Sequence, residues 1–360
     1  MFLSFSMGLL GKHKKNPPFF RWFQQLVILC GMGLKGKEKI GRDPARLPPC
    51  SGRHAESIPL EQSSVMCYAG DWAACLPARH SAPQPDRAKG TTTTMRISCV
   101  IPTRNRPEMT CRAIASVVAQ DTPVSEIIVV DDGSTDHTAA LVAARFPGVR
   151  LLRCSGLGPG LARNAGVAGA CGEVVMFLDS DDVWLEGHVA RLVRTMARGF
   201  PVAYGVTRNC DQVGGGEFFL PEPGMALEGY CLAALSRWCF LVPSAMAVEK
   251  EAFVAAGGFG GGELGEDWSF FIRLAQRFPF GLCGEEPITL RYLHHGSLCN
   301  DATGERLETL LASVSRALAE TGAAAENRVR FQALADWTRQ QGDWQTIQQW
   351  YISLKQEELI

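Results

Sequence analysis

Apolar positions divide the chain into an unpatterned part and a patterned part. Residues 1–94 show no sustained strand or helix periodicity, and their later part is rich in Pro, Ser, Arg and Gly. Because the segment lacks the pattern of regular secondary structure, we expect it to be largely disordered. The pattern changes abruptly at Met95, where we expect the folded part to begin. Met95 is also a candidate for the true start of translation.

Beyond Met95, short apolar runs alternate with helical patterns. The runs have the β-branched content of buried strands, and each of the first three is followed by a predicted helix. The predicted strands cover residues 96–102, 126–130, 149–153 and 174–178, and the predicted helices cover 109–120, 135–145 and 161–170. Strands and helices that alternate at this spacing predict an α/β fold with a right-handed, mainly parallel sheet.

The second half of the patterned region is less regular. Residues 209–265 are Gly-rich and aromatic, an amphipathic helix follows Glu266, and a strand-like run covers 288–292. Residues 304–360 have a helical composition without recognisable chemistry. We therefore expect a C-terminal helical segment over residues 301–360.

The composition argues against a nucleic-acid-binding protein and against a disulfide-rich protein, and it favours the cytoplasm. The formal net charge of -1 argues against a nucleic-acid-binding protein. The 13 cysteines are odd in number and contain no C-x-x-C pair, which favours reduced thiols over a disulfide framework or a zinc site. These features favour a cytoplasmic protein.

The N-terminal region lacks the pattern of a membrane span. Its longest apolar stretch, residues 26–34, is well short of the roughly 20 residues that a spanning helix needs. Positive charge follows the apolar residues 1–10 instead of preceding them, unlike a secretory signal. We expect no integral membrane segment, and peripheral contact with a membrane stays open.

The most informative motif is an acidic turn that follows the predicted strand 174–178. Asp179, Asp181 and Asp182 lie within four consecutive positions. Carboxylates this close repel one another and stay ionised most readily beside a divalent cation. Mg²⁺ or Mn²⁺ would take carboxylate oxygens together with diphosphate oxygens and neutralise a departing nucleotide. The alternative is a solvated turn that caps the next helix.

Two further motifs suit a nucleotide. Asp131 and Asp132 end another predicted strand, where a carboxylate can accept hydrogen bonds from a base or ribose, although this turn could simply cap the next helix. The Gly-rich stretch 156–160 leads into a helix that carries Arg163, an arrangement that suits phosphates. It is not the dinucleotide fingerprint, because Leu161 occupies the final glycine position.

Acidic and imidazole side chains near the C-terminal end of the patterned region complete the candidates. Glu266 and Asp267 open a helix, where acids often only complement the helix dipole, but where either could act as general base towards a hydroxyl. His294 and His295 follow the run 288–292, and either could ligate a metal or contact phosphate, with a structural role as the alternative. We assign His295 to the candidate metal site.

Taken in order, these segments resemble the inverting, non-processive family 2 glycosyltransferases with the GT-A fold. The resemblance covers residues 96–298. Each motif is weak alone, and the ordered set is specific. The matching segments are Val100 to Asn105, Val130 to Asp136, Ala162 to Gly166, Phe177 to Asp182 and Gly265 to Trp268.

The resemblance implies roles for individual residues. The DxD pair Asp179 and Asp181 would hold the metal and diphosphate, with Asp182 sharing that role. Asp267 would be the catalytic base, with its neighbour Glu266 as the rival. Trp238 and Trp268 would lie on the acceptor side. The residues expected to bind the donor are Pro102, Thr103, Arg104, Asp131, Asp132, Arg163, Asp179 and Ser180.

The resemblance also implies a reaction and a division of the domain. Residues 95–190 would bind the nucleotide-sugar, with UDP as the expected nucleotide, and residues 191–300 would bind a carbohydrate or lipid-linked acceptor. The Q-x-x-R-W signature of processive members is missing after Asp267, which favours transfer of a single sugar. The reaction would invert the anomeric configuration, require Mg²⁺ or Mn²⁺, and serve cell-envelope polysaccharide synthesis.

Two other functions compete with this one. The turn Asp179 to Val183 also resembles that of haloacid-dehalogenase-like phosphatases, in which Asp179 would be the nucleophile and Asp181 the acid/base. That family normally begins with this strand, whereas three strand and helix units precede it here. A non-catalytic nucleotide-sugar-binding module is the third interpretation, and it requires Asp267 to be misplaced.

Overall fold

The computed structural model describes residues 95–212, 216–222, 224–237, 239–261, 264–294 and 304–341. The expectation for residues 1–94 lies outside the described residues, as do Trp238 and His295.

The first half of the folded region has the predicted alternation of strands and helices. Its elements are β1 (Ile97–Thr103), α2 (Pro107–Val118), β2 (Glu126–Asp132), α3 (Thr138–Arg145), β3 (Arg150–Cys154), α4 (Pro159–Gly169) and β4 (Val174–Phe177). β1 lies between β2 and β4 and is parallel to both, and β3 is parallel to β2. The predicted parallel sheet is confirmed.

Two helices begin earlier than the periodicity predicts, and both begin with proline. α2 begins at Pro107 and α4 at Pro159, each two residues ahead of the predicted start. Proline suits the first helical position because its fixed φ matches the helix and its missing N–H is not needed there. The spacing of apolar residues does not predict a first helical turn of this kind, because that turn contributes little to the core.

The second half adds antiparallel strands to the sheet. The elements are β5 (Val183–Trp184), α5 (His188–Met196), β6 (Val202–Asp211), β7 (Glu217–Leu220), α6 (Leu232–Leu235), η2 (Pro243–Ala245), β8 (Met246–Glu249), α7 (Lys250–Ala255), α8 (Glu266–Ala275) and β9 (Phe280–Leu293). β8 runs antiparallel to β4 and β6, and β9 runs parallel to β6. The sheet is mixed, with the order β3-β2-β1-β4-β8-β6-β9-β5 and β7 paired to β6.

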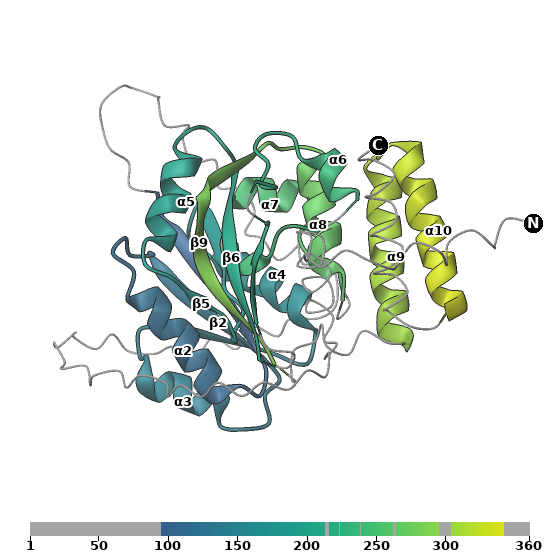
Figure 1. The fold of residues 1–360 in the computed structure, drawn as a ribbon. Helices are drawn as coiled ribbons and strands as arrows, with labels where there is room; N and C mark the ends of the chain where they lie inside the picture. The colour runs from purple at the N-terminus through teal and green to yellow at the C-terminus, as the bar shows by residue number, and fades with distance from the viewer. Residues whose placement is uncertain are drawn as a thin grey trace, which may run out of the picture.

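Helices cover both faces of this sheet. Figure 1 shows α2, α3 and α5 on one side and α4, α7 and α8 on the other. Every residue of β1 and β4 is buried, as expected for central strands covered on both faces. α4 approaches closely at Gly166, where a Cβ atom would lie 2.3 Å from the Val100 side chain. Ligands of sheets of this kind bind at the carboxyl ends of the parallel strands.

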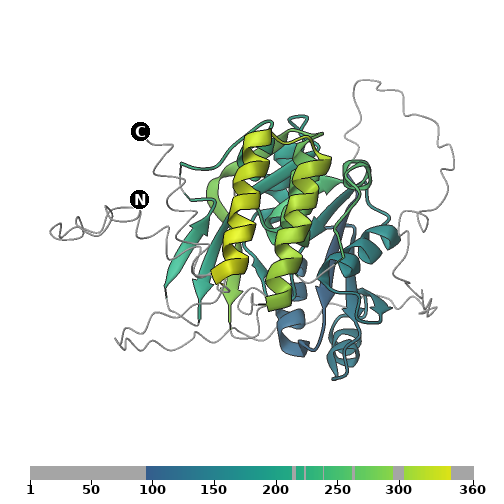
Figure 2. The same cartoon turned by 90° about the vertical axis from the view of Figure 1, so that its right-hand side faces the viewer.

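Two C-terminal helices, α9 (Gly304–Glu320) and α10 (Ala325–Gln341), lie side by side against the outside of α8 (Figures 1 and 2). Leu311, Val314 and Leu318 of α9 are buried and belong to the same hydrophobic core as the sheet. The helical prediction for this region is confirmed up to Gln341. None of the helices in the described part of the chain is long and apolar enough to span a membrane.

Candidate active site

The predicted motifs meet at one edge of the sheet. The register pairs Thr103 at the end of β1 with Asp131 in β2, and β4 ends beside β1 immediately before the acidic turn. The Gly-rich loop before α4 and the start of α8 reach the same edge through contacts described below. Segments that are far apart in sequence thus form a single candidate site.

On the β2 side, the acids shape the backbone. Asp132 accepts hydrogen bonds from the N–H groups of Leu157 (2.7 Å) and Gly158 (2.8 Å), so it ties the Gly-rich loop to β2. Asp131 accepts from the Ser134 N–H at 2.9 Å. The sequence predicted direct contact with the nucleoside. In the structure both carboxylates accept hydrogen bonds from the backbone of neighbouring turns, and their contact with a nucleoside stays a prediction.

The residues after β1 differ in their surroundings. The hydroxyls of Thr103 and Thr110 lie 2.6 Å apart in a buried pair, which directs Thr103 towards α2. Pro102 is buried in β1, whereas Arg104 is exposed and lies over the Gly-rich loop, with its Nη1 3.7 Å from where a Cβ atom of Gly156 would be. Among these three, Arg104 is the exposed side chain, and its contact with the donor stays a prediction.

Arg163 connects the acidic turn to the start of α8. Its Nη2 donates to Oδ1 of Asp179 at 2.5 Å, and its Nη1 donates to Oε1 of Glu266 at 3.1 Å. The residue is 4% exposed, and its guanidinium lies 5.1 Å from the centre of the Phe259 ring. Burial disfavours the charge, but the neighbouring carboxylates outweigh burial and raise the pKa of Arg163. Arg163 therefore stays cationic and holds two of the predicted motifs together.

Asp181 has two basic side chains as partners. Arg106 Nη1 donates to Oδ2 of Asp181 at 2.7 Å, and His294 Nε2 lies 3.2 Å from the same oxygen. Burial acts to raise the pKa of Asp181, but the hydrogen bond from His294 and the charge of Arg106 outweigh it and lower that pKa. Arg112 donates to the backbone carbonyl of Asp181 at 3.0 Å. Asp181 is accordingly ionised at neutral pH.

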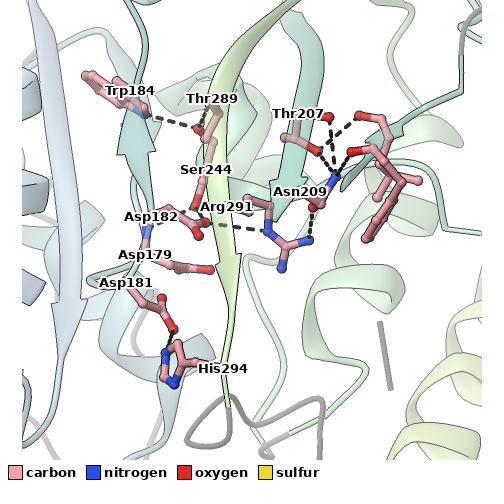
Figure 3. A network of polar contacts seen from close by, with 12 residues as sticks. Asp179, Asp181, Asp182, Trp184, Thr207, Asn209, Ser244, Thr289, Arg291 and His294 are labelled. Atoms are coloured by element: carbon pink, nitrogen blue, oxygen red, sulfur yellow. Dashed lines mark hydrogen bonds and ion pairs between the residues drawn. The ribbon is translucent and has the colours of Figure 1, made fainter. Parts of the chain in front are cut away.

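Asp182 lies behind the turn. It is 3% exposed, accepts a hydrogen bond from Ser244 Oγ at 2.6 Å, and has Arg291 Nε 3.5 Å away (Figure 3). Burial raises the pKa of Asp182 to about 8 against the opposing charge of Arg291. The sequence grouped Asp182 with the metal ligands. The structure directs this carboxylate into the protein, towards Ser244 and Arg291, and its role as a metal ligand stays a prediction.

The donor set of the turn fits a hard divalent cation shared with a ligand. Among the described residues, side-chain hydrogen bonds engage one oxygen of Asp179 and one of Asp181. Over the same residues, no three His, Cys, Asp or Glu side chains form a metal site by themselves. Mg²⁺ in particular is commonly held by one or two carboxylates plus substrate phosphates. Asp179 and Asp181 suit that arrangement.

The two acids at the start of α8 have different environments. Glu266 is buried against Arg163, and burial together with the charge of Asp267 raises the pKa of Glu266 to about 8. Asp267 is only partly buried. Burial raises the pKa of Asp267, while the charges of Arg163 and Arg291 act to lower it. Asp267 is thus the more accessible acid and lies within electrostatic reach of the acidic turn.

Other predicted residues have the following positions. Ser180 is buried within the acidic turn. The indole N–H of Trp268 donates to the carbonyl oxygen of Leu235 at 2.7 Å, and its ring packs on Phe331. Trp268 therefore points towards α6 and α10. Its acceptor-side role stays a prediction.

Sequence reasoning missed three residues of the site: Arg106, Ser244 and Arg291. Arg106, which directly precedes α2, contacts Asp181. Ser244 of η2 and Arg291 of β9 contact Asp182. No spacing signal marks them, because each is brought to the turn by the sheet order. Ser244 does lie in a segment, Pro243 to Val248, that resembles the acceptor-side region of family 2 glycosyltransferases.

Comparisons with known proteins agree with this geometry. Residues 98–238 match the family described as glycosyl transferase family 2. An uncharacterized glycosyltransferase of Nostoc is 34% identical over 168 residues, which cover 44% of this chain and 52% of the Nostoc protein. The succinoglycan biosynthesis protein ExoO of Rhizobium meliloti is 41% identical over 110 residues, which cover 30% of this chain and 32% of ExoO. The chain thus spans about half of the first relative and about a third of the second.

A solved structure shares the fold. The crystal structure of S. aureus TarS residues 1–349 in complex with UDP-GlcNAc superposes with a TM-score of 0.54 at 20% identity, covering 66% of this chain and 70% of that one. This likeness concerns the fold, a mixed and mainly parallel sheet flanked by helices. The family match, the ordered motifs and the shared GT-A fold together indicate that residues 98–238 form a glycosyl transferase family 2 domain.

Proposed function

We propose that the chain transfers a single sugar from a UDP-linked donor to an acceptor hydroxyl, with inversion and with Mg²⁺ or Mn²⁺. The observation that carries the proposal is the contact of Arg163 with both Asp179 and Glu266. It brings the acidic turn and the acids of α8, which are expected to serve the leaving nucleotide and the acceptor, into one site.

The donor half of the proposal rests on the open edge of the parallel strands. Asp179 and Asp181 would hold the cation, which when bound supplies positive charge against the diphosphate as the nucleotide departs. The exposure of Arg104 above the Gly-rich loop supports a contact of this side chain with a phosphate or ribose. Asp132 contributes by fixing the backbone N–H groups of that loop.

The acceptor half rests on the difference between the two acids of α8. Glu266 is held by Arg163, so it serves as a structural partner of that cation. Asp267 is partly exposed, and a carboxylate in this position can accept the proton of an acceptor hydroxyl. Attack by that hydroxyl on the face opposite the nucleotide would invert the anomeric carbon.

The relatives indicate which substrates to test first. The neighbour of known structure was solved with UDP-GlcNAc, and ExoO is described as a succinoglycan biosynthesis protein. UDP-hexoses and UDP-N-acetylhexosamines are therefore the first donors, and carbohydrate or lipid-linked glycans the first acceptors. A cytoplasmic enzyme that acts on envelope polysaccharides, in solution or at a membrane surface, would meet both.

Donor hydrolysis and transfer test the proposal directly. The chain is incubated with a panel of UDP-sugars and Mn²⁺, and UDP release is measured with and without oligosaccharide acceptors. We expect slow release with the correct donor, faster release with an acceptor, and loss of both on chelation or in Asp181→Asn. Asp121→Asn, which removes an exposed carboxylate outside the site, is the matched control.

The outcome is read from the product as well as from the rate. Nuclear magnetic resonance should show a β-linked product from an α-linked UDP-sugar. A retained configuration, or full activity in excess chelator, would refute the mechanism. Donor binding without release would favour a binding module. Hydrolysis of an aryl phosphate would favour the phosphatase, which the family match and the three preceding strands disfavour.

A further inference from the structure

Ser244 in η2 touches the acidic turn at two points. Its hydroxyl accepts a hydrogen bond from the backbone N–H of Asp179 at 3.0 Å and donates one to Oδ2 of Asp182 at 2.6 Å (Figure 3). Ser244 has no exposed surface. One buried hydroxyl thus fixes the first residue of the turn through its backbone and the last through its side chain.

The backbone of Ser244 is itself held from two other strands. Its carbonyl oxygen accepts hydrogen bonds from Trp184 Nε1 at 3.0 Å and from Thr289 Oγ1 at 2.9 Å. Trp184 belongs to β5 and Thr289 to β9, so elements on both sides of the turn determine where the hydroxyl lies. The support of the turn is therefore rigid, because all of these groups are buried.

The same support extends through Asp182 to β6. Arg291 lies 3.5 Å from Asp182 and donates to Oδ1 of Asn209 at 3.2 Å, and Asn209 in turn bonds to Thr207 Oγ1 at 3.0 Å. Asp182 is therefore an anchor of the turn and not one of its exposed carboxylates. The Asp179 and Asp181 carboxylates are more exposed than that of Asp182.

We infer that Ser244 is a positioning residue that fixes the acidic turn in the shape in which Asp179 and Asp181 take up a divalent cation with a nucleoside diphosphate. The inference rests on the proposed function. It predicts that loss of the hydroxyl lowers nucleotide affinity in the presence of the cation more than it lowers nucleotide affinity in its absence. Outer partners of metal ligands commonly change metal affinity about 10- to 100-fold when they are removed.

A matched control is available in β1. Ser98 is also fully buried, donates to a carboxylate oxygen of Glu126 at 2.6 Å, and accepts from the backbone N–H of Gly172 at 2.9 Å. It therefore makes the same two kinds of hydrogen bond as Ser244. Ser98 lies near the amino end of β1, away from the turn.

The experiment compares UDP affinity with and without Mn²⁺ by calorimetry, in the unchanged chain, Ser244→Ala and Ser98→Ala. We expect Mn²⁺ to tighten UDP binding in the unchanged chain and in Ser98→Ala. In Ser244→Ala the increase in UDP affinity caused by Mn²⁺ should be smaller by about 10-fold or more. UDP affinity in chelator should stay the same. Ser244→Cys, which keeps the shape of the side chain but is somewhat larger and only a weak donor, should show an intermediate gain.

The outcomes separate the inference from the proposed function. An equal gain in Ser244→Ala and Ser98→Ala would overturn the role of Ser244 alone. If Ser244→Ala does not fold, a full gain in Ser244→Cys would overturn it in the same way. No affinity of the unchanged chain for UDP, with or without Mn²⁺, would overturn the proposed function and the inference together.

Discussion

The rings of Trp268 and Phe331 meet edge to face, with their centres 6.0 Å apart. Trp268 follows Asp267 directly in α8, and Phe331 lies on α10, the last described helix. The C-terminal helices therefore pack against the element that carries the proposed base. Ser313 of α9 adds a hydrogen bond to Ser269 of α8 at 2.9 Å. A segment without recognisable chemistry in the sequence thus supports the site.

The first prediction concerns this contact. Phe331→Ala should lower the free energy of unfolding by about 3–5 kcal/mol, because it removes a buried aromatic ring and leaves a cavity. Urea denaturation monitored by circular dichroism measures the change. Val329→Ala on the same helix is the control, since Val329 is 68% exposed and its truncation should cost less than about 0.5 kcal/mol. Equal effects of the two substitutions would show that α10 does not pack on α8.

A second prediction concerns the glycine before α8. Gly265 has φ of +76°, and a Cβ atom there would lie 3.0 Å from Leu310 Cα. Gly265→Ala should therefore combine backbone strain of about 1–2 kcal/mol with a displacement of α9. Gly322→Ala, at φ of +63° with open space around it, carries the strain alone. Thermal denaturation should show a larger loss for Gly265→Ala, and a smaller or equal loss would contradict the close approach of α9.

A third prediction separates the two acids of α8. Asp267→Asn should leave UDP-sugar affinity nearly unchanged and lower turnover by about 10²- to 10⁴-fold, as expected for loss of a general base. Above about pH 8, where Glu266 is ionised, Glu266→Gln should instead disturb Arg163, and with it the donor side, because the two charged residues then form a buried ion pair. Steady-state kinetics with the donor varied would distinguish them. Near-normal turnover in Asp267→Asn would refute the assignment of the base.

A fourth prediction concerns pH. Burial raises the pKa of Glu266 to about 8, so the folded chain binds this proton more tightly than the unfolded chain does. The stabilisation from this residue is present below its unfolded pKa, near 4.5, and is lost as the pH rises through about 8. Glu266→Gln, which cannot titrate, should lose less stability between these pH values. Parallel slopes for the two proteins in pH-dependent urea denaturation would contradict the raised pKa.

The sequence by itself determined the parallel half of the sheet and the order of the motifs. Strands β1 and β4 are buried on both faces, so their sequences are continuous apolar runs, and polar residues can appear only where such strands end. Asp132, Asp179 and Asp181 were predictable for that reason. The burial of a strand can therefore be predicted from its local sequence pattern.

Only the tertiary structure decided which side chains face each acid. Arg106 and Asp181 are 75 positions apart, Ser244 and Asp182 are 62 apart, and Arg163 and Glu266 are 103 apart. Local periodicity tells which face of an element is buried, but the partner across the site depends on strand order and crossover direction. β8 and β9 join the sheet out of chain order, and this order brings Ser244 and Arg291 to Asp182. That is why the sequence alone does not reveal that Asp182 faces Ser244 and Arg291 in the fold.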